Sequence, residues 1–148
     1  MAAVDHPRLS GGCLCGNVRF SAVPEKLEMD VCHCSMCRKW SGGVFMAVPC
    51  GDSVEFVKSD TLETYKSSEW GERLFCRACG SSLFWRLQSP HQYVVAMHAF
   101  DDISQFHFAE EIFIDEKPAH YSFSNDTRKL TGAEVMAAFA AGQGSDNG

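Results

Sequence analysis

Three cysteines lie within six residues in the stretch Cys32-His-Cys-Ser-Met-Cys37. Two further groups flank it in the chain, Cys13-Leu-Cys15 before it and Cys76-Arg-Ala-Cys79 after it. Residues i and i+2 of an extended segment face the same side, so a Cys-x-Cys segment can offer both sulfurs to one ion. In the Cys-x-x-Cys group the chain turns back, and the following Gly80 permits a positive φ there. The grouping therefore predicts convergent thiols of the kind that tetrahedral zinc requires.

Three other interpretations compete with metal binding. Buried free thiols would explain a lone cysteine, because Cys packs as a small apolar residue, but they explain three tight groups poorly. Disulfides are rare in reducing compartments, and residues 1–7 show neither the basic nor the apolar region of a secretory signal peptide. A redox Cys-x-x-Cys pair is expected near a βαβ pattern, which the sequence around these motifs does not show. We therefore favour metal binding, in a cytoplasmic protein.

The seven grouped cysteines do not divide evenly into sites of four. Four and three ligands would give one closed structural site and one site with an open position, as expected of catalytic zinc. Spacing alone does not say which groups share an ion, because Cys34 and Cys37 could also join Cys76 and Cys79 in a four-thiolate site. The sequence thus predicts two zinc ions per chain and leaves the partition of the ligands open.

Length and composition indicate an ordinary globular protein. The chain has 148 residues, of which 45% are hydrophobic and 22% charged, and its formal net charge is −6. These values favour a single domain over residues 1–148, with loose termini at residues 1–9 and 142–148. The acidic balance without a basic cluster argues against a nucleic-acid partner. No apolar run approaches the ~20 residues of a membrane helix, and the oligomeric state cannot be predicted from the sequence.

Short alternating runs separated by turn residues predict a mainly β domain with mostly antiparallel strands. Strands are expected at residues 18–22, 44–48, 54–57, 83–87, 93–97 and 112–114, with a turn at 49–52. Two helices are expected as additions to the sheets. A short one opens near Ser35 and ends by Gly42. The other begins at Thr131, because Thr131-Gly-Ala-Glu134 fits a capping box.

Taken together, the cysteine motifs resemble the glutathione-dependent formaldehyde-activating enzyme family and the related centromere protein V-type zinc domain. The segments that carry the resemblance are Gly11-Gly-Cys-Leu-Cys-Gly16, Cys32-His-Cys-Ser-Met-Cys-Arg-Lys39, Arg73-Leu-Phe-Cys-Arg-Ala-Cys-Gly-Ser-Ser-Leu83, Phe100-Asp-Asp102 and Ile112-Phe-Ile-Asp-Glu-Lys117. The resembling core covers about residues 10–132. The resemblance implies a β-tent fold, in which antiparallel sheets are stabilised by zinc.

The same resemblance implies two zinc sites and an activity. The ligands of a structural zinc would be Cys13, Cys15, Cys76 and Cys79. The ligands of a second zinc, with an open fourth position, would be Cys32, Cys34 and Cys37. The implied activity is that of a carbon–sulfur lyase acting on the adduct of glutathione, or of another small thiol, with formaldehyde or a similar aldehyde. The alternative is a non-catalytic zinc scaffold or protein-interaction module, because the centromere-associated relative and the Rab-binding zinc chaperones use similar folds in that way.

Several residues near these motifs are further candidates. Arg38 follows the last cysteine of its group, and we expect it either to capture a substrate carboxylate or to lie on a solvated helix face. His33 should point away from the metal, because it alternates with two ligands in an extended segment. Cys50 is expected to be a free thiol in a turn rather than a fourth ligand. The sequence departs from the family at Glu111, where members often have His, and at residues 118–121, where they often have Pro-Trp.

Overall fold

The computed structural model describes residues 6–141 of the chain. The predicted loose tail at 142–148 lies outside the described residues, as do residues 1–5 of the predicted loose N-terminus. The elements are β1 (Leu9–Gly12), β2 (Arg19–Ala22), β3 (Glu28–Cys32), α1 (Ser35–Ser41), β4 (Phe45–Gly51), β5 (Glu55–Lys58), β6 (Leu62–Lys66), β7 (Gly71–Cys76), β8 (Ser82–Leu87), β9 (Gln92–Ala96), η1 (Met97–Ala99), β10 (His107–Ile112), η2 (Ile114–Glu116), β11 (Arg128–Leu130) and α2 (Gly132–Ala141). The prediction of a mainly β fold is confirmed.

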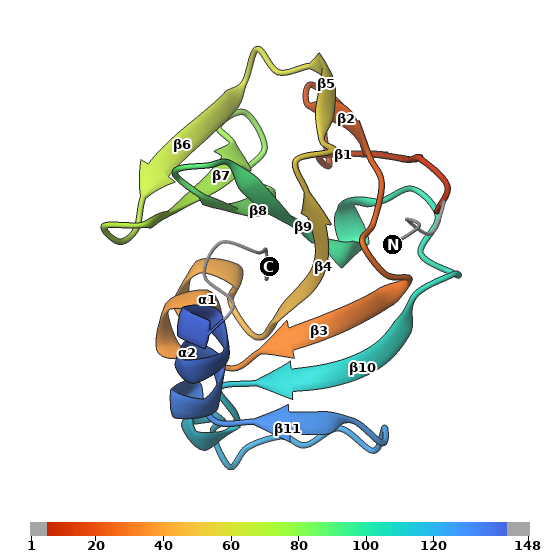
Figure 1. Cartoon of the computed structure of the whole chain (residues 1–148). Coiled ribbons are helices and arrows are strands. Elements are labelled where there is room, and N and C mark those ends of the chain that lie inside the picture. Colours follow the sequence, from red (N-terminus) through yellow and green to blue (C-terminus); the bar gives the residue numbers. More distant parts are fainter. Residues whose placement is uncertain (1–5, 142–148) are drawn as a thin grey trace.

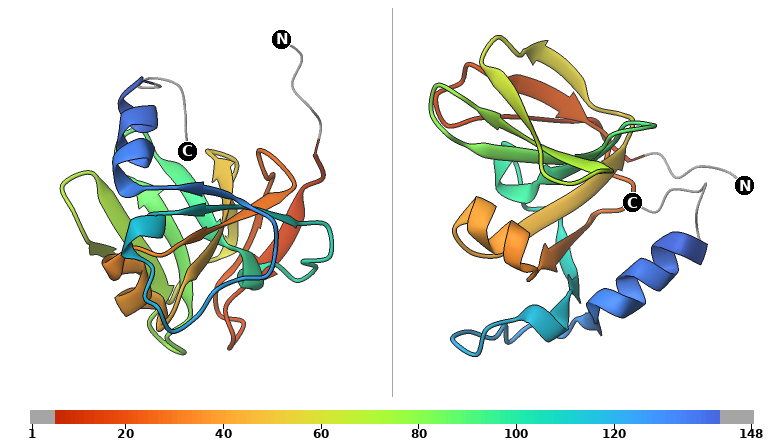
Figure 2. Two further views of the ribbon diagram at one scale, coloured as in Figure 1. Left: turned by 90° about the horizontal axis from the view of Figure 1, so that it is seen from below. Right: turned by 90° about the vertical axis from the view of Figure 1, so that its left-hand side faces the viewer.

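The strands form two sheets (Figure 1). The smaller sheet has the order β1-β2-β5, and the larger has the order β11-β10-β3-β4-β9-β8-β7-β6. Figure 2 shows that the larger sheet is strongly curved. From β3 to β6 its neighbours are antiparallel. β10 is parallel to both β3 and β11, so this sheet is mixed.

The main core fills the space between the two sheets. β2 alternates as its sequence predicts, since Phe20 and Ala22 are buried while Arg19 and Ser21 are partly exposed. Phe20 of the smaller sheet meets Phe84 of the larger one edge to face, with ring centroids 5.0 Å apart. Such aromatic pairs add to the free energy of burial, because the positive ring edge faces the negative ring face.

A second apolar cluster lies on the opposite face of the larger sheet. Along β3 the side chains alternate, so that Met29 and Val31 enter the main core while Cys32 joins the second cluster. That cluster also contains Phe45 and Cys37. The alternation of β3 therefore divides its residues between the core and the face that carries the second cysteine group.

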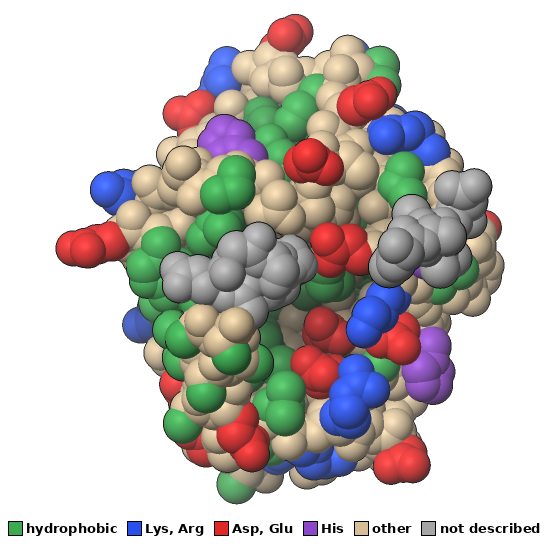
Figure 3. Space-filling model, in the orientation of Figure 1, with side chains coloured by type: hydrophobic (Ala, Val, Ile, Leu, Met, Phe, Trp, Pro, Cys, Tyr) green, Lys and Arg blue, Asp and Glu red, His purple; other side chains and the backbone are tan. Residues whose placement is uncertain are grey.

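In the orientation of Figure 1, Figure 3 shows a hollow in the middle of the molecule, bordered by acidic side chains with basic ones beside them.

Both predicted helices are present, and their ends differ only slightly from the prediction. Cys34, not Ser35, is the N-cap of α1, and Gly42 ends the helix with a φ of 73°. The capping box of α2 is confirmed, because the Glu134 N–H donates to Thr131 Oγ1 and the Thr131 N–H donates to Glu134 Oε1. Between residues 6 and 141, neither helix is long and apolar enough to span a membrane.

Two local predictions were wrong. The strand expected at 112–114 ends at Ile112, because Phe113 adopts a left-handed conformation with a φ of 55° and η2 follows it. Residues 49–51 of the turn expected at 49–52 belong to strand β4, which continues through Gly51 with a register shift between Pro49 and Gly51, so that only Asp52 lies in a turn. A proline has no N–H to donate to a sheet, and such an irregularity is one place where a strand accepts it.

Candidate metal centres

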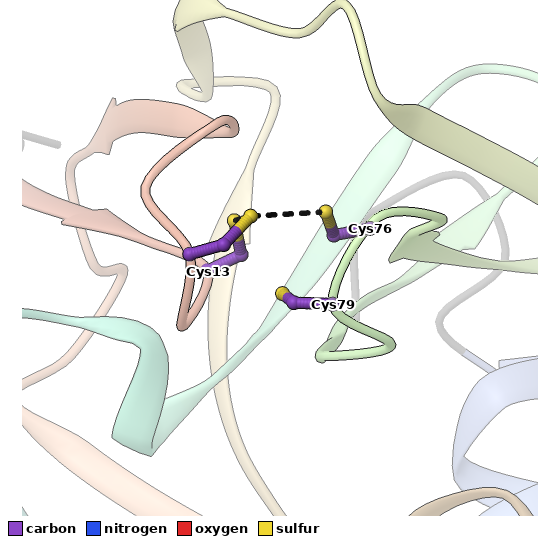
Figure 4. A group of neighbouring side chains, drawn as sticks. Cys13, Cys76 and Cys79 are labelled. Carbon is purple, nitrogen blue, oxygen red and sulfur yellow. Dashed lines mark hydrogen bonds between the residues drawn. The ribbon is translucent and has the colours of Figure 1, made fainter.

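Four cysteines from two distant parts of the chain form the first centre. Cys13 follows β1 and Cys15 lies in the next turn, whereas Cys76 ends β7 and Cys79 lies in the hairpin between β7 and β8. Their four sulfurs lie within 4.8 Å of one another. Figure 4 shows Cys13 facing Cys76 and Cys79 across a small gap. The fold thus brings together the first and last cysteine groups and places the middle group elsewhere.

The spacing of these sulfurs fits a tetrahedral ion. The Sγ atoms of Cys13 and Cys15 are 3.6 Å apart, and those of Cys15 and Cys76 are 3.8 Å apart. Four sulfurs at Zn–S distances of about 2.3 Å would form a tetrahedron with edges of about 3.8 Å. Two turns with glycine at positive φ, Gly16 at 82° and Gly80 at 80°, aim the thiols inward. The donor set and its geometry therefore suit zinc.

Polar hydrogens point at two of these sulfurs, and at Cys79 they favour the thiolate form. The Val18 N–H donates to Cys13 Sγ at 3.2 Å. The pKa of Cys79 is lowered to about 5 by hydrogen bonds from the Ser81 hydroxyl and from the backbone N–H groups of Ser81 and Cys15. Because a metal binds the thiolate rather than the thiol, such contacts reduce the cost of deprotonating the ligands.

The first centre also joins the two sheets. Cys13 directly follows β1 of the smaller sheet, and Cys76 belongs to β7 of the larger sheet. Cys15 and Cys76 are 61 positions apart in the chain. An ion held here would link segments that are distant in sequence, and the four thiols would fill all positions of a tetrahedron.

The second centre is local in the chain. Cys32 ends β3, Cys34 caps α1, and Cys37 lies in the first turn of that helix, where its N–H donates to Cys34 Sγ at 3.4 Å. The three sulfurs lie within 4.8 Å of one another. Cys32 and Cys37 are buried, whereas Cys34 is partly exposed. Within residues 6–141, no fourth cysteine, histidine or carboxylate joins this group.

Hydrogen bonds among the three thiols shift their pKa values in opposite directions. Hydrogen bonds from Cys32 and Cys37, and from the backbone N–H groups of Cys37 and Met36, hold the pKa of Cys34 far below its usual value. The pKa of Cys32 is raised, first by its hydrogen bonds to Cys34 and Cys37 and then by burial. The trio therefore stabilises a thiolate on Cys34, the most exposed of the three, toward which the other two thiols point.

Comparison with known proteins shows the family of this chain. The family model described as glutathione-dependent formaldehyde-activating enzyme matches residues 8–116. The chain belongs to this family. An uncharacterised lyase of Schizosaccharomyces pombe is 33% identical over 131 residues, which span 88% of this chain and 96% of that protein.

Two further proteins extend the comparison. A protein of Halomonas elongata that carries the family's name is 38% identical over 85 residues, which cover 51% of this chain and 54% of that protein. The crystal structure of a Rhodobacter sphaeroides protein has a similar fold, with a TM-score of 0.55 and 24% identity over 63% of this chain and 88% of that chain. The latter likeness concerns the fold alone.

His33 lies between two cysteines of the second centre in the sequence, but its side chain faces away from that centre. Its side chain is completely buried, with Nε2 2.8 Å from Glu111 Oε1 and Nδ1 2.9 Å from the Tyr121 hydroxyl. Both ring nitrogens of His33 therefore have a polar partner. The second oxygen of Glu111 accepts from Thr127 Oγ1 at 2.7 Å. Glu111 and Tyr121 thus hold the segment between two candidate ligands.

Arg38 lies beside the second centre and supports the same segment. Its Nε donates to the backbone carbonyl of His33 at 2.9 Å. On the other side of the loop, the Ser35 N–H donates to Glu116 Oε1 at 2.9 Å. Arg38 therefore has a partner in the protein and is partly buried rather than fully solvated. Capture of a substrate carboxylate by this arginine stays a prediction.

Arg73 is a residue of the second centre to which the sequence analysis assigned no role. It is only 4% exposed, and its Nη1 donates to Cys37 Sγ at 3.5 Å. Its guanidinium carbon lies 5.1 Å from the centroid of the Trp40 ring. Arg73 occupies a buried position of β7, between Gly71 and Leu74. A charged side chain at such a position needs a partner, and this is the signal in the sequence that could have indicated its role.

Cys50 belongs to neither centre. It lies in β4 rather than in the expected turn, is buried in the main core, and directs its Sγ toward the Val48 carbonyl at 3.5 Å. Burial, together with the negative charge of Glu25, raises the pKa of its thiol to about 12. Cys50 is thus a protonated core residue and provides a useful control for substitutions in the two centres.

Proposed function

We propose that this chain is a zinc-dependent carbon–sulfur lyase that acts on the adduct of a small thiol, such as glutathione, with an aldehyde, such as formaldehyde. One observation carries the proposal: three convergent thiols, Cys32, Cys34 and Cys37, form a group of three in a chain of this family. Three protein ligands leave a tetrahedral ion one position for a ligand from solution. The names of the related proteins, a lyase and a formaldehyde-activating enzyme, support the reaction class.

The two cysteine groups would have different tasks. Cys13, Cys15, Cys76 and Cys79 complete a four-sulfur set, which is typical of structural zinc. Soft thiolate ligands in a tetrahedral arrangement favour zinc over the harder cations. A reducing compartment such as the cytoplasm would keep all eight cysteines free of disulfides and available for this purpose.

Charge favours a thiol over water as the fourth ligand of the second centre. Three thiolates and a divalent cation carry one net negative charge, so the centre would activate water less well than one built from neutral histidines. When bound, the ion would lower the pKa of a thiol that joins the three cysteines and would hold its sulfur as a thiolate. That chemistry matches a substrate whose reacting atom is sulfur.

The protein's own residues would bind and shield the substrate. Trp85, Val94 and Ala96 pack against the second cysteine cluster and give it an apolar surround. Low water content beside the sulfur would strengthen every electrostatic contact there. We propose that Arg38, next to the cysteine group, directs a carboxylate of glutathione through its planar guanidinium. In the lyase direction the carbon–sulfur bond breaks, the electron pair stays on sulfur, and the adduct hydroxyl loses its proton as the aldehyde carbonyl forms.

Calorimetry of the zinc-loaded protein with glutathione, in buffers of different ionisation enthalpy, tests the proposal. We expect release of about one proton near pH 7, because the thiol must deprotonate when it joins the metal. Cys37→Ser should abolish both the binding and the cleavage of the glutathione–formaldehyde adduct. Cys50→Ser is the matched control and should behave like the wild type. Binding without proton release, or binding unchanged in Cys37→Ser, would contradict the proposal and favour a non-catalytic scaffold.

A further inference from the structure

Arg73 is a buried cation next to the second cysteine centre. Among residues 6–141, no aspartate or glutamate forms an ion pair with its guanidinium. An arginine stays protonated at any ordinary pH, and a buried charge is stable only when another group compensates it. The group that Arg73 faces is the second cysteine centre, through its contact with Cys37 Sγ.

A second arginine in the same sheet has its charge compensated in the usual way, by a carboxylate. Arg86 lies on β8, the strand next to β7, and its side chain is 15% exposed. Its Nη2 lies 2.6 Å from Glu72 Oε2, and its Nε also donates to that carboxylate. Arg73 is more deeply buried than Arg86 and yet has a cysteine sulfur where Arg86 has a glutamate. Within the part of the chain that the structure describes, the sheet therefore places a positive charge without a carboxylate partner beside the cysteines.

The position of this charge is held from several sides. Arg73 lies in the middle of β7, where it is paired with Tyr65 on one side and with Trp85 on the other. The ring of Trp40, from α1, lies 5.1 Å from its guanidinium carbon, at a distance that favours a cation–π contact. A cation that is buried and held in place acts on its neighbours with little screening by solvent or salt.

We infer that Arg73 determines the ligand preference of the second centre, in that its positive charge makes the open position accept an anionic sulfur rather than a neutral ligand. This inference rests on the proposed function. Three thiolates and a divalent cation already carry one negative charge, and an incoming thiolate would add a second one. Arg73 offsets one of these charges at the sulfur of Cys37, whereas a neutral fourth ligand gains nothing from it.

The test compares a thiol and a neutral ligand on the same metal. Protein loaded with Co²⁺ is titrated with 2-mercaptoethanol, whose only ionisable group near neutral pH is its thiol, and separately with imidazole, with the cobalt absorption as readout. We expect Arg73→Met to weaken binding of the thiol about tenfold or more and to leave binding of imidazole unchanged. Arg73→Lys retains the charge and should lie between Arg73→Met and the wild type. Arg86→Met, which removes an arginine already balanced by Glu72, should leave both affinities unchanged.

The outcomes separate this inference from the function on which it rests. Equal weakening of both ligands in Arg73→Met, or of neither, would overturn the inference and leave Arg73 as a packing residue. A loss of the thiol preference in Arg73→Lys as large as in Arg73→Met would also overturn it, because the charge would then have no effect. A wild-type protein that binds imidazole but not the thiol would overturn the proposed function, and this inference with it.

Discussion

His33 and Glu111 lie 78 positions apart in the chain, and His33 Nε2 and Glu111 Oε1 are 2.8 Å apart in the interior of the protein. Both side chains are almost completely buried. The contact joins the segment between Cys32 and Cys34 to β10. A backbone bond from the His33 N–H to the Ile112 carbonyl, 3.1 Å long, runs alongside it. The His33–Glu111 pair therefore fixes the segment that carries the second cysteine centre, although neither side chain belongs to the group of three cysteines.

Replacement of Glu111 should destabilise the protein. Glu111→Gln leaves a buried amide where His33 and Thr127 now donate to a carboxylate, and we expect a loss of about 1–3 kcal/mol in the free energy of unfolding. Urea denaturation at pH 7 measures it. Glu110→Gln is the matched control, because Glu110 directly precedes Glu111 in β10 but is 18% exposed and pairs with Arg128. A loss as large in Glu110→Gln would show that the effect does not come from the buried network.

The same variant should have a characteristic pH dependence. Burial alone would raise the pKa of Glu111, but hydrogen bonds from Thr127 and His33 outweigh it and hold the pKa below its usual value. A carboxylate with a depressed pKa stabilises the fold above the pKa of the unfolded chain, about 4.3, and this contribution is lost as the pH falls through the folded value. The stability difference between wild type and Glu111→Gln should therefore shrink between pH 5 and pH 3. A difference that grows in this range would contradict the assignment.

The wild-type protein should contain two zinc ions per chain, because the structure forms one group of four cysteines and one of three. Elemental analysis after purification without chelators measures this content. Cys37→Ser should hold one ion, and Cys50→Ser, with its substitution in the main core, should hold two. A reproducible content near zero in the wild type would contradict both centres.

The two centres should differ in what they contribute to folding. Structural zinc supplies an apparent ~10–16 kcal/mol in small domains, which is similar to or larger than the ~5–15 kcal/mol net stability of a whole protein. Since the first centre joins two sheets, Cys76→Ser should yield unfolded or insoluble protein. Cys37→Ser should retain the circular dichroism spectrum of the wild type, because its centre lies within one short segment. The opposite result for the two variants would reverse these roles.

Gly132 should be intolerant of a side chain for reasons unconnected with the metal. A Cβ atom at this position would lie 2.6 Å from Cε1 of the Phe113 ring. Overpacking of this kind costs about 1–3 kcal/mol, so Gly132→Ala should lower the midpoint of thermal unfolding. Gly43→Ala is the control, because a Cβ there would meet nothing within 4 Å. Equal midpoints for the two variants would contradict the tight packing of α2 on Phe113.

The sequence by itself determined the features that depend on near neighbours. The capping box of α2 spans four residues, so the local sequence is enough to predict it. The spacing of the cysteines likewise predicted that thiols converge, but it left open which groups share an ion. Alternation along β2 predicted which of its residues are buried, because successive side chains of a strand point to opposite faces. β6, by contrast, was missed, because it is an exposed edge strand with the sequence Leu-Glu-Thr-Tyr-Lys and lacks an apolar pattern.

Only the tertiary structure decided which distant segments meet. Alternation shows that a side chain leaves one face of a strand, but the neighbour it finds there depends on strand order and register. The parallel pairing of β3 with β10 brings Glu111 to His33, and the order of strands in the larger sheet brings Arg73 to Cys37. The turn after β1 likewise lies against the β7–β8 hairpin, which places Cys76 beside Cys15, 61 positions away in the chain. These contacts join residues that are far apart in the chain, so the spacing of neighbouring residues cannot predict them.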